Sequence, residues 1–195
     1  SGQLGEDFRH AIGALLDIRI PQDAWWAMDY HLDWLVGALA LARDGQMGGE
    51  ARLNPSMRVN NKPVALVQGN QEDIDLVVAF DNTLILIEAK GDTSWSNTQL
   101  NSKVLRLEII LRETGTARSS LNQLAVYFIL MSPKESDSLK RDPGLSWPDW
   151  MIKDGKPMWT PMRMAEAGLE PAFLRVVRCQ DEDGLVGKEG SYWKV

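Results

Sequence analysis

The chain has 195 residues, 44% of them hydrophobic and 25% charged, which predicts one domain with a packed core. We take that domain to span residues 1–195, with a core at about 22–131 and a C-terminal elaboration at about 132–195. No apolar run approaches the length of a membrane span. The net charge of −6 argues against tight, non-specific binding of a polyanion by charge alone.

The charge is unevenly distributed along the chain. Residues 1–89 hold six basic and 13 acidic groups, a balance of −7, whereas residues 90–195 hold 15 basic and 14 acidic groups, a balance of +1. Cys179 is the one cysteine, so no intrachain disulfide forms, which favours a reducing cytoplasm. With His10 and His31 as the two histidines, a Cys/His zinc site is improbable.

Two amphipathic helices are expected in the first third of the chain. Apolar residues recur at helical spacing over about 4–18, and Pro21 follows. A longer stripe predicts a second helix that ends near Asp44-Gly45. Its members are Trp25, Met28, Leu32, Leu35, Val36 and Leu39. Residues 44–62 are rich in Gly, Asn and Arg and predict a loop.

A first strand is expected at Val64–Gln68, and a β-hairpin is expected at residues 73–90. Asp81-Asn82 has turn chemistry. If the turn holds those two residues, Asp75 falls opposite Glu88, and Asp73 falls opposite Lys90 by the same register.

That register places Asp75, Glu88 and Lys90 on one face of the hairpin. Two neighbouring carboxylates repel each other unless a cation lies between them, and oxygen ligands suit Mg²⁺ or Mn²⁺. We expect Asp75, Glu88 and the backbone carbonyl of Ala89 as metal ligands, with Lys90 as the catalytic cation. Asp73 competes with Asp75 for the ligand role. A plain ion pair between Glu88 and Lys90 at a strand end remains the structural alternative.

Ser96-Asn97-Thr98-Gln99 predicts a capping box that opens a helix, which Gly115 ends. Gln99, Lys103 and Arg106 share one helix face, which could meet phosphates or simply face solvent. Trp95, in the loop before the helix, is expected to pack.

Leu124–Met131 is almost wholly apolar and predicts a strand buried on both faces. Residues 132–171 predict an irregular segment or short helices. Late strands are expected at Phe173–Cys179 and Tyr192–Val195.

Asp75, followed by Glu88-Ala89-Lys90 at the end of an apolar strand, resembles the PD-(D/E)XK nuclease superfamily over about residues 64–131. The resemblance implies an α/β fold with a restriction-endonuclease-like core, a central mixed β-sheet flanked by helices in the order α-β-β-β-α-β. No proline precedes Asp75, where Ile74 stands. A tyrosine found in one subgroup is replaced here by Lys103.

By this resemblance the chain is expected to be a Mg²⁺- or Mn²⁺-dependent hydrolase that cleaves DNA or, less often, RNA. Asp75, Glu88 and Lys90 map onto the motif, and Gln99 is placed for the helix glutamine of some relatives. An N-terminal acid can join such a site, and a solvated helix face is the favoured interpretation for each candidate here. The candidates are Glu6, Asp29 and Asp33. A homodimer or a targeting partner protein could supply affinity, and a catalytically silent scaffold that binds nucleic acid or protein is the alternative.

Overall fold

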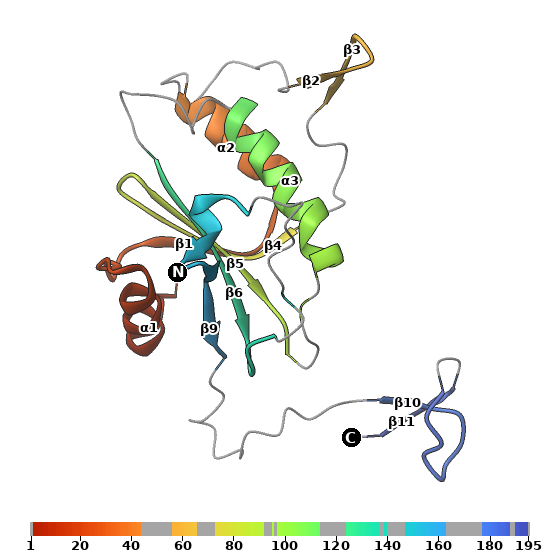
Figure 1. Cartoon of the computed structure of the whole chain (residues 1–195). Coiled ribbons are helices and arrows are strands. Elements are labelled where there is room, and N and C mark those ends of the chain that lie inside the picture. The colour runs from red at the N-terminus through yellow and green to blue at the C-terminus, as the bar shows by residue number, and fades with distance from the viewer. Residues whose placement is uncertain are drawn as a thin grey trace.

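The computed structural model describes most of the chain. The described residues are 2–43, 56–65, 73–91, 95, 97–113, 124–136, 139, 147–162, 177–187 and 190–194. Within them the protein is an α/β structure with a five-stranded mixed sheet and three α-helices (Figure 1). None of the described helices has the length and apolarity needed to span a membrane.

The helices alternate with the strands of the main sheet along the chain. In the first half the elements are α1 (Glu6–Leu16), β1 (Trp25–His31), α2 (Leu32–Arg43), β2 (Ser56–Val59), β3 (Lys62–Ala65), β4 (Asp73–Phe80) and β5 (Thr83–Ala89). In the second half they are α3 (Asn97–Glu113), β6 (Ala125–Ser132), the 3₁₀ turn η1 (Asp149–Met151), β7 (Ile152–Lys153), β8 (Lys156–Pro157), β9 (Trp159–Pro161), β10 (Val177–Cys179) and β11 (Tyr192–Lys194).

The main sheet has the strand order β1-β4-β5-β6-β9. Strands β1, β4 and β5 pair antiparallel, whereas β6 runs parallel to both β5 and β9. A parallel neighbour requires a crossover, and α3 provides it between β5 and β6. The sheet is therefore antiparallel on one side of β5 and parallel on the other.

Two apolar clusters cover the two faces of this sheet. On one face, α2 and α3 lie side by side over the strands (Figure 1) and contribute buried residues such as Leu35 and Leu107. On the other face, Ile12 and Leu16 of α1 pack with Ile85 and Ile129 of the sheet. We call these the α2/α3 face and the α1 face.

The predicted hairpin is confirmed in its turn and register. Phe80 pairs with Thr83 and Leu76 pairs with Ile87, so Asp81-Asn82 form the two-residue turn. Asp81 has a φ of 45°, the left-handed conformation that a tight hairpin demands and that aspartate tolerates better than most residues.

Three further predictions are confirmed within a few residues at each end. The first helix is α1, the helix after the hairpin is α3, and the apolar strand is β6. β6 is covered on both faces: Phe128 and Leu130 belong to the α2/α3 cluster, and Ile129 belongs to the α1 cluster. Burial on both faces explains why its sequence shows no alternation.

The prediction of one long helix from Trp25 to about Asp44-Gly45 is wrong before Leu32, and its predicted end agrees with that of α2 at Arg43. Residues Trp25–His31 form β1, the edge strand paired with β4, and only Leu32–Arg43 are helical. Trp, Tyr and His have modest helix propensity, and aromatic residues suit a pleated surface. The helical spacing of the apolar residues is real, but pairing with β4 overrides it before Leu32.

The loop predicted at residues 44–62 is wrong where the structure describes it, whereas the strand predicted at Val64–Gln68 is present at Val64 and Ala65. Residues 44–55 and 66–68 lie outside the described residues. A separate hairpin, β2–β3, occupies part of the expected loop, and its second strand begins at Lys62 and not at Val64. Asn60 and Asn61, with φ of 50° and 62°, form its turn. Because β2–β3 lies outside the main sheet, the three sheet strands before α3 are β1, β4 and β5.

The C-terminal third contains short elements, in line with the irregular segment expected there. η1, the β7–β8 hairpin and β9 precede a two-stranded β10–β11 ladder. The late strands at Phe173–Cys179 and Tyr192–Val195 are confirmed for Val177–Cys179 and Tyr192–Lys194; residues 173–176 and 195 lie outside the described residues. In Figure 1 the β10–β11 ladder stands apart from the five-stranded sheet.

Candidate active site

Glu88 lies one residue before the end of β5, on the α2/α3 face of the sheet. Residues Leu86 and Leu84, two and four positions earlier, belong to the apolar cluster of that face, so alternation places Glu88 there too. Its side chain is only 9% exposed, and Lys103 Nζ of α3 donates to its Oε1 at 2.5 Å. A buried carboxylate is thus held against the ammonium of the covering helix.

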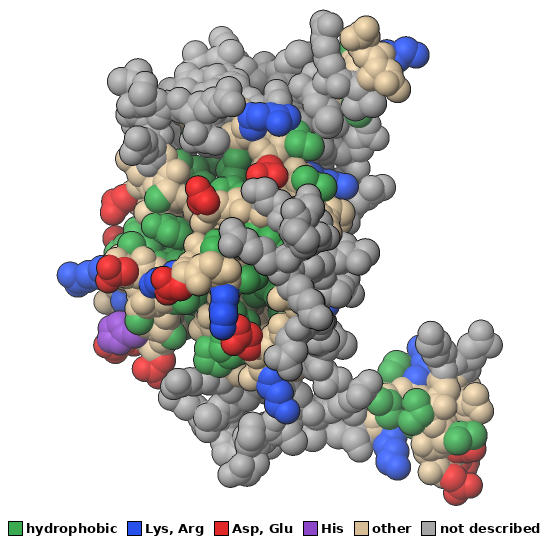
Figure 2. All heavy atoms as spheres, viewed as in Figure 1, with side chains coloured by type: hydrophobic (Ala, Val, Ile, Leu, Met, Phe, Trp, Pro, Cys, Tyr) green, Lys and Arg blue, Asp and Glu red, His purple; other side chains and the backbone are tan. Residues whose placement is uncertain are grey.

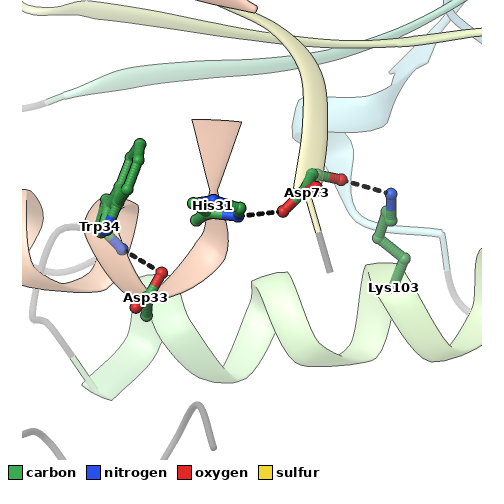
Figure 3. Close-up of polar contacts among 5 residues, drawn as sticks. All are labelled: His31, Asp33, Trp34, Asp73 and Lys103. Carbon is green, nitrogen blue, oxygen red and sulfur yellow. Dashed lines mark hydrogen bonds and ion pairs between the residues drawn. The ribbon is translucent and has the colours of Figure 1, made fainter. Parts of the chain in front are cut away.

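Lys103 also contacts the strand next to β5. Its Nζ donates to the backbone carbonyl of Asp73 at 2.9 Å, as the dashed line in Figure 3 shows. The Lys103 side chain is 17% exposed. One ammonium therefore joins the start of β4 to the end of β5, where the candidate acids lie.

Asp75 contacts the chain next to Glu88 directly. Its Oδ2 accepts a hydrogen bond from the backbone N–H of Ala89 at 2.6 Å. The hairpin pairs extend to Leu76 and Ile87, and the next pair in that register is Asp75 with Glu88. The structure therefore brings the Asp75 carboxylate to the Glu88–Ala89 peptide, although the observed ladder itself ends at Leu76 and Ile87.

The strands β1 and β4 are irregular next to the candidate site, at Asp29 and Asp75. Residues two apart in a regular strand share a face, yet Ile74 packs in the α2/α3 cluster and Leu76 packs against the α1 cluster. The β1–β4 pairs omit Asp29 and Asp75, and Asp29 has a φ of 49°. The ladder is therefore disrupted where Asp75 turns its carboxylate to the β5 backbone.

Asp73 does not share the position of Asp75. It pairs with His31 in the β1–β4 ladder, and its Oδ1 bonds to His31 Nδ1, as Figure 3 shows. The Trp34 ring lies edge-to-face against the His31 ring, with centroids 4.4 Å apart and an interplanar angle of 82°. The carboxylate of Asp73 is thus engaged by histidine, and its backbone carbonyl by Lys103.

Lys90 follows β5, where its backbone N–H donates to the Met131 carbonyl at 2.8 Å. Its Nζ lies 4.7 Å from the centre of the Trp95 ring. Trp95 is 3% exposed and packs in the α2/α3 cluster, and its backbone carbonyl accepts a hydrogen bond from Ser136 Oγ at 2.7 Å. Packing, the role expected of Trp95, is confirmed, and its ring also positions the Lys90 ammonium.

The remaining predicted residues are placed as follows. Ala89 is the last residue of β5, so its carbonyl lies at the strand end. Gln99 lies in the first turn of α3, but its side chain and the Ser96 cap lie outside the described residues. Arg106 is half-buried on α3, one turn beyond Lys103.

The N-terminal acids are not equivalent. Glu6 is exposed and lies 3.9 Å from His10 on α1, a solvated helix pair. Asp29 is exposed on β1 and not on a helix, at the position that the β1–β4 ladder leaves unpaired. Asp33 accepts a hydrogen bond from the backbone N–H of Trp34 at 2.9 Å, at the start of α2.

Burial raises the pKa of the Tyr30 phenol above its ordinary value, and the charge of nearby Asp33 raises it further. Tyr30 lies one residue before His31 on β1, and its ring packs against the α2/α3 cluster. The phenol thus stays neutral to higher pH than a tyrosine in water.

His31 is the site residue that sequence reasoning missed. The expected helix gave it no partner, whereas the observed strand places it opposite Asp73. The aromatic, β-prone composition of residues 25–31 was the available signal for that strand.

The candidate ligand atoms at the strand ends are of the type that a hard cation prefers. Asp75 Oδ, Glu88 Oε and the Ala89 carbonyl are all oxygen donors, as Mg²⁺ and Mn²⁺ prefer. Among the described residues no group of three or more His, Cys, Asp or Glu side chains converges as a metal cluster. In the structure Lys103 holds the Glu88 carboxylate, so a metal ion there would compete with an ammonium.

The surface in Figure 2 shows acidic and basic side chains interspersed around apolar ones over the described part of the main body. On the face that Figure 2 shows, the described side chains form no large basic patch, in line with the net charge of −6. Comparison with protein-family models, with curated proteins and with solved structures finds no match to this chain.

Proposed function

We propose that the protein is a metal-dependent nuclease with a restriction-endonuclease-like core that hydrolyses phosphodiester bonds of DNA. The observation that carries this proposal is the contact of the Asp75 carboxylate with the Ala89 backbone, one residue from Glu88 and next to Lys90. An acid on one strand is thereby held against an acid-x-lysine triplet at the end of its neighbour.

In this proposal Asp75, Glu88 and the Ala89 carbonyl hold Mg²⁺ or Mn²⁺. When bound, such an ion polarises a phosphoryl oxygen and lowers the pKa of a bound water. The ligand chemistry supports the assignment, because three oxygen donors lie at adjoining strand ends.

Two lysines surround these acids, and they have different surroundings. Lys103 bonds to Glu88 Oε1 at 2.5 Å and holds the carboxylate in place. Lys90 is positioned by the Trp95 ring. We assign Lys90 the role of stabilising negative charge on the phosphate, and Lys103 the role of positioning Glu88.

The experiment compares the purified wild-type chain with Asp75→Asn, Glu88→Ala and Lys90→Met on plasmid, single-stranded DNA and RNA, with Mg²⁺, Mn²⁺ or EDTA. Asparagine at 75 still accepts the Ala89 N–H, so that variant removes charge and preserves the contact. We expect each variant to lose about a hundredfold or more in cleavage rate. Asp75→Asn and Glu88→Ala weaken the proposed metal site, whereas Lys90→Met removes the cation assigned to the phosphate.

Matched controls come from exposed residues on the β7–β8 turn and β8. Asp154, with a φ of 51°, tolerates Asn, and Lys156 is exposed, so Asp154→Asn and Lys156→Met should cleave like the wild type. Cleavage that is equal in all variants, or that persists in EDTA, would refute the proposal.

A second candidate function is a nuclease-like scaffold that binds without cutting. The ion pair between Lys103 and Glu88 favours it, because the pair neutralises the acid without any metal. A chain that binds DNA yet does not cut it under any metal condition, with Glu88→Ala binding as the wild type does, would select the scaffold.

A further inference from the structure

An exposed group of aromatic side chains lies where β1 joins α2. We call Trp25, Tyr30 and Trp34 the aromatic patch. Trp25 is 50% exposed and Trp34 is 54% exposed, whereas Tyr30 is partly buried against the α2/α3 cluster. Large aromatic rings exposed together on one surface are uncommon without a binding role.

The three rings form a row around Tyr30. The Trp25 and Tyr30 centroids are 5.5 Å apart at 83°, and the Tyr30 and Trp34 centroids are 5.7 Å apart at 75°. The Trp34 ring also contacts the ring of His31, which in turn bonds to Asp73, as Figure 3 shows. Edge-to-face contacts fix the rings in place while half of each tryptophan stays open to solvent.

Acidic groups flank this row. The Asp33 carboxylate accepts a hydrogen bond from the backbone N–H of Trp34. It also lies close enough to Tyr30 for its charge to raise the pKa of the phenol. Asp29 is exposed one residue before Tyr30. Lys103, which bonds to the backbone of Asp73 beside His31, is already paired with the Glu88 carboxylate. The patch therefore combines negative ring faces with carboxylates.

Elsewhere the chain places its own cations over tryptophan rings. Lys90 Nζ lies 4.7 Å from the Trp95 centre, and the Arg178 guanidinium carbon lies 4.8 Å from that of Trp193, which is 64% exposed. In the described part of the chain no cation is placed in this way over Trp25 or Trp34.

We propose that the aromatic patch binds an arginine-bearing basic segment of a partner protein, with a guanidinium stacked on Trp25 or Trp34 and paired with Asp33. Arginine fits better than lysine because its planar guanidinium stacks on rings and is more weakly hydrated. A nucleic-acid strand fits less well, because each stacked base would bring a phosphate towards Asp29 and Asp33.

This inference goes beyond the proposed nuclease function and does not depend on it. A basic partner would nevertheless help an acidic chain approach a polyanion, because its charge would offset the net charge of −6. The acidic N-terminal half, which contains the whole patch, is the part of the chain that such a partner would contact.

The test measures binding of a labelled peptide of alternating arginine and glycine to the full chain by fluorescence anisotropy, in low salt and EDTA. We expect Trp25→Ala and Trp34→Ala each to weaken binding about two- to fivefold, as loss of one cation–π contact predicts. Asp33→Asn, which keeps the hydrogen-bond acceptor, should weaken it similarly. Trp34→Phe should bind nearly as the wild type does.

Trp193→Ala is the control, because it removes another exposed tryptophan on a different element. Its affinity for the peptide should match the wild type, and a glutamate–glycine peptide should not bind. Absence of arginine-peptide binding, or equal binding by every variant, would overturn the proposal. Tighter binding of oligothymidylate that is lost in Trp34→Ala would also overturn it, in favour of nucleic acid.

Discussion

The two faces of the five-stranded sheet are packed in different ways. The α1 face is closed by aliphatic side chains such as Ile12, Ile85 and Ile129. The α2/α3 face has a larger apolar cluster, but the Glu88–Lys103 ion pair lies at its border. Charges placed against an apolar layer are costly to desolvate, so one face is built for stability alone and the other also carries polar chemistry.

This difference indicates where substitutions should alter stability and where they should alter activity. The α1 face responds to side-chain volume, because its interactions are dispersion and burial. The border of the α2/α3 face responds to charge, because Asp73, Asp75, Glu88 and Lys103 share a small region. Four substitutions test the comparison, in order of decreasing expected effect on stability.

Ile129→Ala on the α1 face should have the largest effect. Its side chain is fully buried in β6 between β5 and β9, so truncation leaves a cavity. We expect the free energy of unfolding to fall by about 2–5 kcal/mol, measured by urea denaturation. Nucleic-acid cleavage or binding should stay unchanged at temperatures where the variant is folded. A selective loss of activity in the folded variant would break the comparison.

Glu88→Ala on the opposite face should have a smaller effect on stability and a larger one on activity. It leaves the Lys103 ammonium without its carboxylate at 17% exposure, which should reduce stability by about 1–3 kcal/mol. Glu88→Leu combined with Lys103→Met should recover much of that loss, since no charge remains unpaired. A double variant less stable than Glu88→Ala would contradict this account.

Asp73→Asn tests the pair with His31 at the edge of the same face. The side chains of His31 and Asp73 are 24% and 42% exposed, so solvent screens the interaction. We expect a loss of about 0.5–1 kcal/mol in urea denaturation at low salt, and a smaller loss at high salt. His31→Gln should lose a similar amount. If the loss of stability did not depend on salt, the packing of the His31 ring against Trp34 would explain it in place of the charge interaction.

Tyr30→Phe should have the smallest effect, seen at alkaline pH. Because the pKa of Tyr30 is raised in the folded state, the unfolded chain releases this proton first, and stability falls as pH rises above about 10. Between pH 8 and pH 11 the free energy of unfolding of the variant should therefore fall less than that of the wild type, as measured by urea denaturation. Tyr192→Phe, at an exposed position, should behave as the wild type. Parallel pH profiles for Tyr30→Phe and the wild type would refute the assignment.

The β4–β5 hairpin and its acids were predictable from the sequence because they depend on local interactions. A short turn fixes the register, and two apolar strands with Asp81-Asn82 between them leave few alternatives. That register places Asp75 near Glu88 in sequence terms, and the irregular backbone at Asp75 then brings its carboxylate to the Ala89 N–H. The α3 helix and the doubly buried β6 strand were likewise evident from periodicity and composition.

The tertiary structure alone decided the β1 strand and the partners of the polar residues. Residues 25–31 have the apolar spacing of a helix, yet they form a strand. Pairing with the edge of β4 satisfies their backbone groups and outweighs that spacing. The bond of His31 to Asp73, and that of Lys103 to Glu88, join residues 42 and 15 positions apart. Such contacts depend on which strands pair and on how a helix crosses the sheet, which the spacing of residues within one element does not specify.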